Sequence, residues 1–146
     1  MGCGRTGAAL ATDLSADGHD VTVLDTDAAA FRFLPDDFSG AKYVGSGLDI
    51  DTLRKVKLDD ADAFISTTRG DNRNVMAAQM AKHVFRVKVV GCRVFDPMRE
   101  EMYRNLGLRT INPTRVQAKR LKRMIEAPTD EAAGELVREF MRQEAG

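Results

Sequence analysis

The first 27 residues, MGCGRTGAALATDLSADGHDVTVLDTD (residues 1–27), decide the fold. Gly2, Gly4 and Gly7 form a G-x-G-x-x-G loop, and Asp25 ends the apolar run VTVLD 18 residues after Gly7. In dinucleotide-binding folds this loop is the turn between the first strand and the first helix, and an acidic residue follows the second strand. Loop, strand and acid in this register predict an α/β fold that binds a nucleotide.

Met1 is the only residue that precedes this loop. A Rossmann-like sheet places its first strand in the centre, where it is paired on both sides. We therefore expect a sheet whose first strand is missing or truncated, and a natural protein with about five more apolar residues before Gly2, the length of an ordinary strand. Unpaired edges on both sides of the gap would make the fold marginal and its nucleotide binding weak.

Four further strand-like runs follow at intervals of about 22 residues, with sequence compatible with helices between them: residues 20–25, 41–46, 63–68 and 87–92. This alternation predicts a doubly wound parallel sheet. In the first helix, 7–17, we expect Ala8, Ala9 and Leu10 to lie on the sheet. A helix over 72–85 would bury one stripe, with its methionines in the core; the stripe comprises Val75, Met76, Gln79, Met80 and His83.

The remainder of the chain predicts a helix that begins at Pro97 and ends at Gly107, a short strand at 109–112, and a helix from Pro113 that stops at Ala127-Pro128. A final amphipathic helix would carry Leu136, Val137, Phe140 and Met141 on its apolar face. We therefore predict a nucleotide-binding domain at 1–125 and a C-terminal helical tail at 126–146.

The bulk composition fits a single soluble domain, and no apolar run approaches a membrane span. Cys3 and Cys92 are expected to be reduced, and two histidines without a cysteine cluster predict no metal site. Charge is unevenly spread, because residues 13–62 hold 12 acidic and 5 basic side chains whereas 82–123 hold 3 acidic and 12 basic. This asymmetry indicates charged surfaces that meet a partner or each other.

The glycines have separate expected roles: Gly2 makes the tight turn, Gly4 lets backbone N–H groups approach phosphate, and Gly7 allows close helix–strand packing. Asp25 would accept hydrogen bonds from both ribose hydroxyls, which favours NAD or adenosine phosphates over NADP. The Arg5 guanidinium could reach a terminal phosphate or a partner subunit's nucleotide, or lie in solvent.

Two further pairs lie near the expected site. Thr67 and Thr68 end a strand at the same sheet edge as the loop. Asp71 and Asn72 are expected to cap the helix that follows.

Catalysis is not expected. A nicotinamide enzyme needs a proton donor and a substrate-binding region. His19 and His83 lie at peripheral positions, and Tyr43 and Tyr103 lack the lysine of a Tyr-x-x-x-Lys pair.

Four segments together resemble the RCK (TrkA-N) nucleotide-binding domain of Trk/Ktr potassium-transport regulators, over about residues 2–125: GCGRTGAALATDLSADGHDVTVLDTD, GDNRNVMAAQMAK, VVGCRVFDPMREEMYRNLG and INPT. The resemblance implies a cytoplasmic homo-oligomer, a dimer or an octameric ring, at the inner face of the membrane. It would bind NAD(H) or ATP/ADP, gate an integral membrane potassium channel or transporter, and bind no nucleic acid.

Carried over by position, Arg5 would lie near the outermost phosphate, and Asp27 at the ribose or base. The family usually has Gly-Asp-Ala where this chain has Gly45-Ser46-Gly47, so the family's base contacts do not carry over by position here. The predicted nucleotide-binding residues are Gly2, Cys3, Gly4, Arg5, Thr6, Gly7, Asp25, Thr26, Asp27, Ser46, Gly47, Thr67, Thr68 and Arg93.

Two other functions stay open at this point. One is a fragment of an NAD-dependent dehydrogenase, against which the absent proton donor argues. The other is a redox-sensing DNA-binding regulator, suggested by five basic residues among the nine of 115–123, although a solvated helix face or a subunit contact explains them as well. The expected subunit contact is the helix at 97–106 with Met98, Met102 and Leu106, for which a purely intramolecular role is the alternative.

Overall fold

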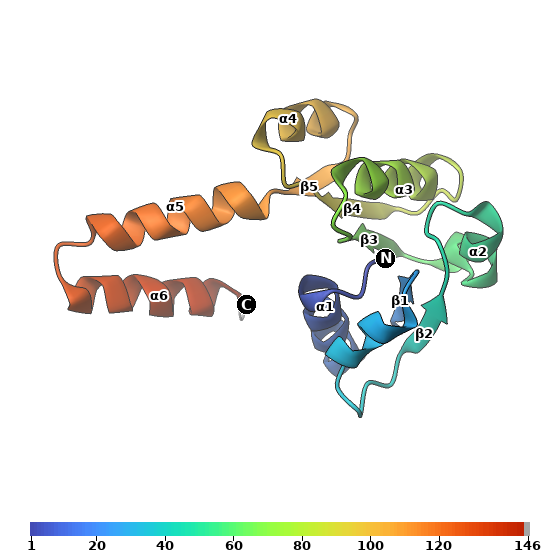
Figure 1. Cartoon of the computed structure of the whole chain (residues 1–146), viewed down its shortest axis with the longest axis horizontal. Helices are drawn as coiled ribbons and strands as arrows, with labels where there is room; N and C mark the ends of the chain where they lie inside the picture. Colours follow the sequence, from blue (N-terminus) through green and yellow to red (C-terminus); the bar gives the residue numbers. More distant parts are fainter. Residues whose placement is uncertain (145–146) are drawn as a thin grey trace.

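Short parallel strands and surrounding helices make up the computed structural model, which describes residues 1–144 (Figure 1). The strands are β1 (Thr22–Asp25), β2 (Ala41–Val44), β3 (Ala63–Ser66), β4 (Val89–Arg93) and β5 (Arg109–Ile111). The α-helices are α1 (Arg5–Ala16), α2 (Ile50–Lys55), α3 (Asp71–His83), α4 (Pro97–Asn105), α5 (Pro113–Glu126) and α6 (Asp130–Glu144), and the 3-10 helices are η1 (Ala28–Phe33) and η2 (Leu58–Asp60). The predicted α/β class is confirmed.

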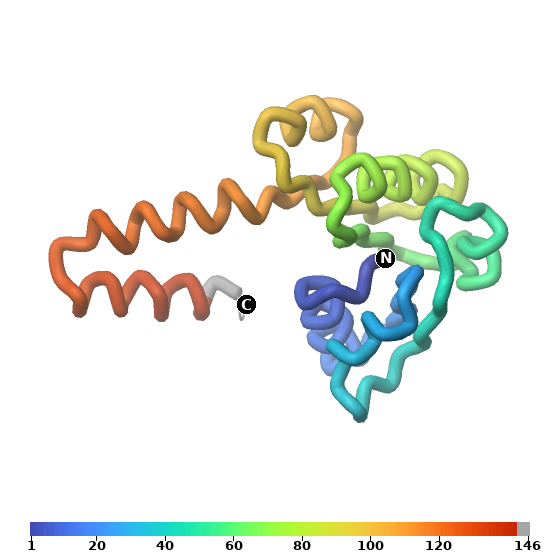
Figure 2. Tube along the Cα trace, in the orientation of Figure 1, coloured from blue at the N-terminus to red at the C-terminus, as the bar shows by residue number. Residues whose placement is uncertain are grey.

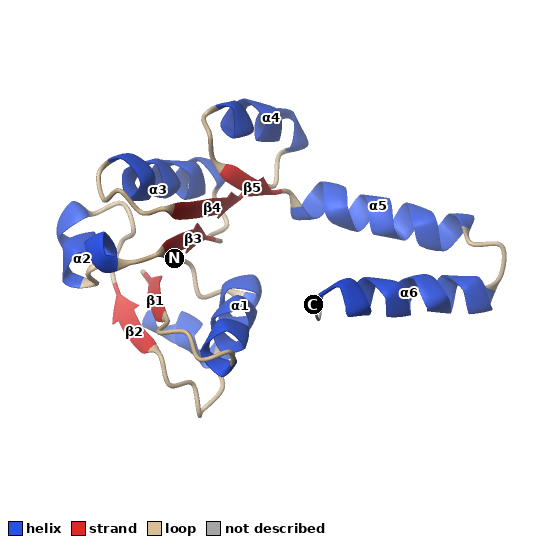
Figure 3. Cartoon of the chain, turned by 180° about the vertical axis from the view of Figure 1, so that it is seen from behind, coloured by secondary structure: helices blue, strands red, loops and turns tan. Residues whose placement is uncertain are grey.

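The strands form two sheets, β1-β2 and β3-β4-β5, and every pairing is parallel (Figure 3). Met1 and Gly2 lie between them. The Met1 amine donates to the Ile65 carbonyl at 2.7 Å, the Thr67 N–H donates to the Met1 carbonyl at 2.9 Å, and the Gly2 N–H donates to the Leu24 carbonyl at 2.8 Å. Met1 and Gly2 thus occupy the position of the carboxyl end of a central strand. This agrees with the expected sheet whose first strand is truncated.

Helix α1 packs on η1, and through small residues about one turn apart it shares a core cluster with Val23 of β1. Ala8 and Ala11 are buried, whereas Ala9 and Leu10 are exposed. The expectation that Ala8, Ala9 and Leu10 lie together on the sheet is therefore wrong, because only residues three or four apart share a helix face.

The buried face of α3 also differs from the prediction. Met76 is 55% exposed and His83 is exposed, so they are not core residues. The buried face is instead made of small residues, and it lies on β3 and β4. Alanine brings the helix axis close to the sheet; Met76 is left on the outside, whereas Met80 is partly buried against the core, as predicted. The buried residues are Asn74, Val75, Ala77, Ala78 and Ala81.

The core falls into two clusters of buried side chains. The larger one lies around β3, β4 and α3 and includes Leu24, Phe64 and Val90. The smaller one joins α1, β1 and η1 and includes Val23 and Phe38. Leu24 and Val23 are neighbours on β1, so opposite faces of that strand contact different clusters.

Helices α5 and α6 form an antiparallel hairpin that extends from the sheets (Figure 2). No residue of α5 is buried. At the root of α5, the Asn112 side chain accepts from the Arg115 N–H at 2.9 Å, and the buried Glu100 carboxylate pairs with Arg104 at 2.7 Å and Arg115 at 3.7 Å. Within residues 1–144, no helix has the length and apolar character needed to cross a bilayer.

Stability is expected to fall by about 2 kcal/mol between pH 8.5 and pH 5.5 because the Met1 amine is buried. Burial lowers the pKa of this amine from 8.0 to about 6, and the nearby Asp25 and Cys3 oppose the shift. An amine whose pKa is lower in the folded than in the unfolded chain binds a proton more readily when the chain unfolds. Its contribution to the free energy of unfolding is therefore complete above pH 8 and is lost as the pH falls toward 6. Urea unfolding at both pH values measures the loss. An N-terminally acetylated chain should lack it, and an equal loss in that chain would contradict the assignment.

Candidate nucleotide-binding site

The glycine loop is tightly packed at two positions and open at the third. Gly2 has a φ of +91°, and a Cβ there would lie 2.9 Å from the Thr68 nitrogen. A Cβ on Gly7 would overlap the Gly2 carbonyl oxygen and lie 2.8 Å from the Thr67 hydroxyl. A Cβ on Gly4 would meet no heavy atom within 4 Å. The loop is therefore fixed on its protein side and accessible at Gly4.

The N-terminus of α1 opens beside Gly4. Gly4 is the N-cap, no side chain caps the helix, and its first turn contains no acidic residue. A helix begins with N–H groups that have no partner within the helix, and these carry partial positive charge. The start of α1 can therefore donate to an anion, as predicted for a phosphate.

Asp25 lies beside the loop at the end of β1. One carboxylate oxygen accepts from the Cys3 N–H at 2.7 Å, and the other accepts from the Asp27 N–H at 3.0 Å. The Asp25 carboxylate thus fixes the backbone of the glycine loop as well as the turn that follows β1. Each carboxylate oxygen can accept a second hydrogen bond, so the group can still bind hydroxyls.

The other predicted residues of this edge have local roles. The Asp27 carboxylate accepts from the Ala29 N–H at 2.9 Å and caps η1, and Thr26 is exposed. The Ser46 hydroxyl accepts from the Leu48 N–H at 3.2 Å. Gly47 is buried where a Cβ would overlap the Met1 thioether. Gly47 therefore packs against the residue that precedes the loop.

Arg93, at the end of β4, reaches across the carboxyl ends of the strands to α1. Its guanidinium donates to the Thr67 carbonyl, to the Thr68 carbonyl at 3.0 Å and to the Thr6 hydroxyl at 3.2 Å. It also stacks on the Phe95 ring at 4.5 Å.

These partners of Arg93 are all neutral. Burial lowers the pKa of the guanidinium, although Asp71 opposes the shift, and an arginine stays charged at neutral pH regardless. Among residues 1–144, no carboxylate pairs with Arg93. Its cation therefore lies near the loop without an ion pair, and Asp71 is the acid whose charge acts on it.

The fully buried Asn74 organises the same edge, and the sequence prediction missed it. Its side-chain oxygen accepts from the Thr68 N–H at 2.8 Å and the Thr68 hydroxyl at 2.7 Å. Its amide donates to the Thr68 carbonyl at 2.8 Å and the Arg93 carbonyl at 2.9 Å. A sequence signal existed, because Asn74 shares helical spacing with Ala77, Ala78 and Ala81.

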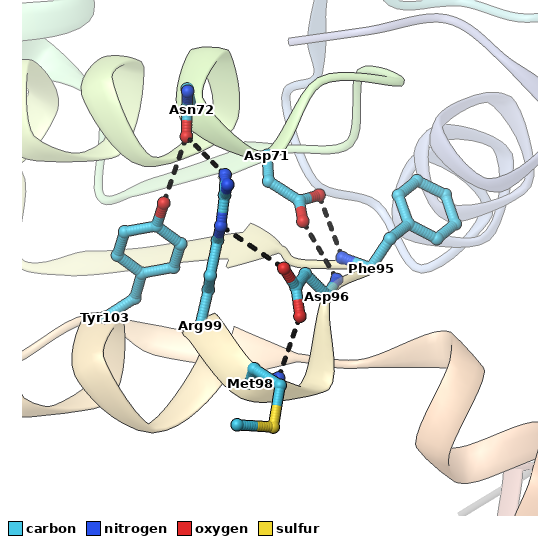
Figure 4. Close-up of polar contacts among 7 residues, drawn as sticks. All are labelled: Asp71, Asn72, Phe95, Asp96, Met98, Arg99 and Tyr103. Atoms are coloured by element: carbon cyan, nitrogen blue, oxygen red, sulfur yellow. Dashed lines mark hydrogen bonds and ion pairs between the residues drawn. The ribbon is translucent and has the colours of Figure 1, made fainter.

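Helix α4 is anchored to the start of α3 by a second polar cluster (Figure 4). The Asp71 carboxylate accepts from the N–H groups of Phe95 at 2.8 Å and Asp96 at 2.9 Å. The Asn72 oxygen accepts from the Tyr103 hydroxyl at 3.0 Å. The N-cap of α3 is Gly70, without a side-chain cap. The prediction that Asp71 and Asn72 cap their own helix is therefore wrong, since both reach the segment after β4.

Arg5 is the one predicted phosphate ligand that does not join this group. It is exposed and lines a shallow hollow of about 460 Å³ between α1 and η1, together with Phe33 and Pro35. The described residues give it no polar partner. The remaining groups fit an anionic ligand with hydroxyls, because they combine open helix N–H donors, an arginine cation without an ion pair and a carboxylate.

The TrkA-N domain family matches residues 1–113. The chain is 42% identical over 125 residues to the Trk system potassium uptake protein TrkA of Streptomyces coelicolor, covering 86% of this chain and 56% of that protein. It is 31% identical over 129 residues to a TrkA homolog of Methanothermobacter thermautotrophicus, covering 88% and 59%. The chain thus spans little more than half the length of these relatives.

Two solved structures share the fold. The NAD(P)-binding domain of an exopolyphosphatase-related protein from Archaeoglobus fulgidus matches with a TM-score of 0.69 at 20% identity, over 86% of this chain and 93% of that one. The C-terminal domain of Kef from Shewanella denitrificans, in an AMP-bound form, matches with a TM-score of 0.70 at 19% identity, over 99% and 89%. At these identities the likeness establishes the Rossmann-like fold alone.

Proposed function

The chain belongs to the TrkA-N domain family, and from this membership we propose that it binds an adenine nucleotide and regulates a membrane potassium transporter. The observation that carries the proposal is the open N-terminus of α1 at Gly4, with Asp25 and Arg93 on either side of the loop. The names of its relatives support potassium uptake as the process that it serves.

Each part of a nucleotide has a proposed partner in the site. The N–H groups at the start of α1 would bind the phosphates, and the Arg93 guanidinium would add a positive charge beside them. The Asp25 carboxylate would accept from the ribose hydroxyls while it holds the Cys3 N–H. A 2′-phosphate would bring negative charge to this carboxylate, so we propose NAD(H) or ATP/ADP as ligand rather than NADP.

Replacing Asp25 with asparagine should weaken nucleotide binding at least tenfold, about 1.4 kcal/mol. Asparagine keeps an oxygen that can accept from the Cys3 N–H, but it loses the charge and the second acceptor for the ribose. Isothermal titration with NAD, NADH, ATP, ADP and NADP measures the change.

The exposed Asp20, replaced in the same way, is the control and should bind like the wild type. Unchanged affinity in the Asp25 variant would remove this carboxylate from the site. Failure of all five nucleotides to bind the wild-type chain would overturn the proposed function.

We further propose a regulatory role without catalysis. The polar groups at the site are suited to bind and position a ligand: they are the Asp25 carboxylate, threonine hydroxyls and the Arg93 guanidinium. The carboxylate and the arginine are both engaged with the backbone. A conformational change on nucleotide binding would be transmitted to the transporter through subunit contacts, at the cytoplasmic face of the membrane.

The proposed subunit contact is the outer face of α4. Met98 is 87% exposed, Met102 53% and Leu106 50%, which supports a subunit contact rather than a purely intramolecular role. Exposed apolar side chains at helical spacing are typical of a protein–protein contact. We propose a homo-oligomer, with a dimer as its smallest form and an octameric ring as the larger one.

Replacing Met102 with glutamate should lower the oligomeric state, because it places a charge in the centre of the apolar stripe. Light scattering at physiological salt and tens of micromolar protein, a concentration at which weak subunit contacts are populated, reads the change directly. Glutamate at the exposed Met76 of α3 is the control. A wild-type chain that is already monomeric would contradict the proposed contact.

A further inference from the structure

The outer edge of β2 carries backbone groups that no other strand covers. Strand β2 lies at the margin of its sheet, because that sheet contains only β1 and β2 (Figure 3). Ala41 and Gly45 donate their N–H groups to carbonyls of the β1 segment. In a parallel ladder, alternate residues bond to opposite neighbours, so the N–H and carbonyl groups of Lys42 and Val44 point outward. Within residues 1–144, no strand pairs with these four groups.

The side chains of β2 leave this edge accessible on both faces of the sheet. All four residues of the strand are exposed, whereas strands of a parallel sheet are ordinarily covered on both faces. Tyr43 is 42% exposed and Val44 is 61% exposed, and as neighbours in a strand they lie on opposite faces. Lysine on an edge strand discourages pairing, but the Lys42 ammonium lies over the buried Phe38 ring, 5.7 Å from its centroid. The edge therefore combines outward backbone groups with one accessible apolar side chain on each face.

Two aspartates lie at the amino end of β2. Asp36 and Asp37 are exposed, and neither forms an ion pair with another described residue. They come directly before Phe38, whose ring contacts the start of the strand, since a Cβ on Gly40 would lie 2.5 Å from it. Residues 21–51 hold six aspartates and two basic residues, so the charge around the strand is negative.

The carboxyl end of β2 is acidic as well. A Cβ on Gly45 would lie 2.7 Å from the Thr52 methyl group, so the first turn of α2 lies beside this end of the strand. Asp49 and Asp51 belong to this turn and are exposed. Asp51 pairs with Arg54 at 3.6 Å, whereas Asp49 has no ion pair within residues 1–144. Hydrogen bonds from Thr52 lower the pKa of the Asp49 carboxyl group, so it is charged at neutral pH.

From these observations we propose that the outer edge of β2 binds an extended, basic segment of a partner protein as an added strand. The backbone of that segment would pair with the outward groups of Lys42 and Val44, and its apolar side chains would cover Tyr43 and Val44. Lysine or arginine on either side of this apolar centre would meet the aspartates at the two ends of β2. A second copy of the same edge would bring like charges together, which opposes self-pairing.

The membrane transporter is a source of such a segment, because cytoplasmic loops of membrane proteins carry an excess of lysine and arginine. This link to the transporter rests on the proposed function, whereas the properties of the edge do not. The outward groups of Lys42 and Val44 point away from β1 and from Asp25, the proposed ribose ligand. Peptide and nucleotide would therefore have separate contacts on the chain.

A fluorescein-labelled peptide tests the edge. It has blocked termini, alternating valine and threonine over about five residues, the length of an ordinary strand, and two lysines at each end. Fluorescence anisotropy, titrated with the chain, should show saturable binding that weakens as salt is added. Glutamate in place of the lysines should weaken binding at least tenfold. N-methylation at alternate residues should also weaken it at least tenfold, because the peptide then lacks hydrogen bonds to the edge.

Variants of the chain locate the bound strand. Val44→Pro removes an outward N–H at a position where an edge strand tolerates proline, and it should weaken peptide binding at least tenfold. Val44→Thr is the matched control, because threonine keeps the N–H and the branched shape, and it should bind within about threefold of the wild type. Both variants should keep the nucleotide affinity of the wild type. Failure of the edge and failure of the proposed nucleotide binding are therefore distinguishable.

A second pair of variants tests the charges. Asp36→Asn combined with Asp37→Asn should weaken binding of the lysine peptide at least threefold. The same change at the exposed Asp59 and Asp60 of η2 is the control and should have no effect. Should Val44→Pro fail to fold, the N-methylated peptide decides. The proposal is overturned by absence of saturable binding, by equal binding of the three peptides, or by a lower oligomeric state of folded Val44→Pro in light scattering, which would make a second copy the occupant.

Discussion

Alanine at Gly7 is expected to lower the free energy of unfolding by about 3 kcal/mol and to abolish nucleotide binding. The added methyl group would overlap the Gly2 carbonyl oxygen and press on the Thr67 hydroxyl, which itself donates to that carbonyl at 3.0 Å. Backbone cannot yield as a flexible side chain does, so α1 must move away from the loop. Urea unfolding followed by circular dichroism gives the loss of stability.

Alanine at Gly4 is the matched control from the same loop. It would meet no heavy atom within 4 Å, and Gly4 has a φ of −74°, which any residue adopts. Its stability should stay within about 0.5 kcal/mol of the wild type. Its nucleotide affinity should nevertheless fall at least tenfold, because the methyl group occupies the space through which a phosphate approaches. Full affinity in this variant would show that the phosphates bind elsewhere, and full stability of the Gly7 variant would refute the close packing of α1.

Alanine at Asn74 should destabilise the fold by about 4 kcal/mol, with a fall in melting temperature on the order of 10 °C. It removes the Asn74 partner of the Thr68 N–H, the Thr68 hydroxyl and the Arg93 carbonyl at the end of the sheet, whereas the Thr68 carbonyl keeps its hydrogen bond from Arg93. Each unsatisfied buried group costs about 1–3 kcal/mol. Differential scanning calorimetry measures the loss.

The exposed Asn72, on the same helix, provides the comparison. Its replacement by alanine removes the hydrogen bond from the Tyr103 hydroxyl and should cost about 1 kcal/mol. Equal losses in the Asn72 and Asn74 variants would mean that burial of Asn74 does not decide its contribution. Because Asn74 positions Thr68 and Arg93, its replacement should also weaken nucleotide binding.

Local sequence signals predicted the order of the elements well. Pro97 and Pro113 begin α4 and α5 as expected, and Gly107, with a φ of +72°, follows the end of α4. These features depend on backbone conformation and on hydrogen bonds within a few residues, which the sequence determines directly.

Contacts between distant segments were harder to predict. Periodicity identified α3 as a helix and placed Val75 and Met80 correctly on the core side, but it missed the buried alanines, which pack as well as methionines and allow a closer approach. The functions of Asp71 and Asn72 depend on the segment after β4, more than 20 residues away. The hydrogen bond from the Cys3 N–H to the Asp25 carboxylate likewise could not be predicted, because it depends on β1 and the glycine loop lying side by side. The sequence therefore identified the residues proposed to bind the ligand, but it did not predict the hydrogen bonds that position them.

The helix hairpin has a mechanical consequence. Helix α5 has 14 residues, leaves the sheets as a single rod of about 21 Å, and buries no side chain along its length. Its direction is set at its root, by the Asn112 cap and by the carboxylate of Glu100 between Arg104 and Arg115. A rod of this length converts a rotation of about 10° at the root into a displacement of about 4 Å at the tip. The hairpin therefore amplifies small rotations that arise at its root, where α4, β5 and α5 meet.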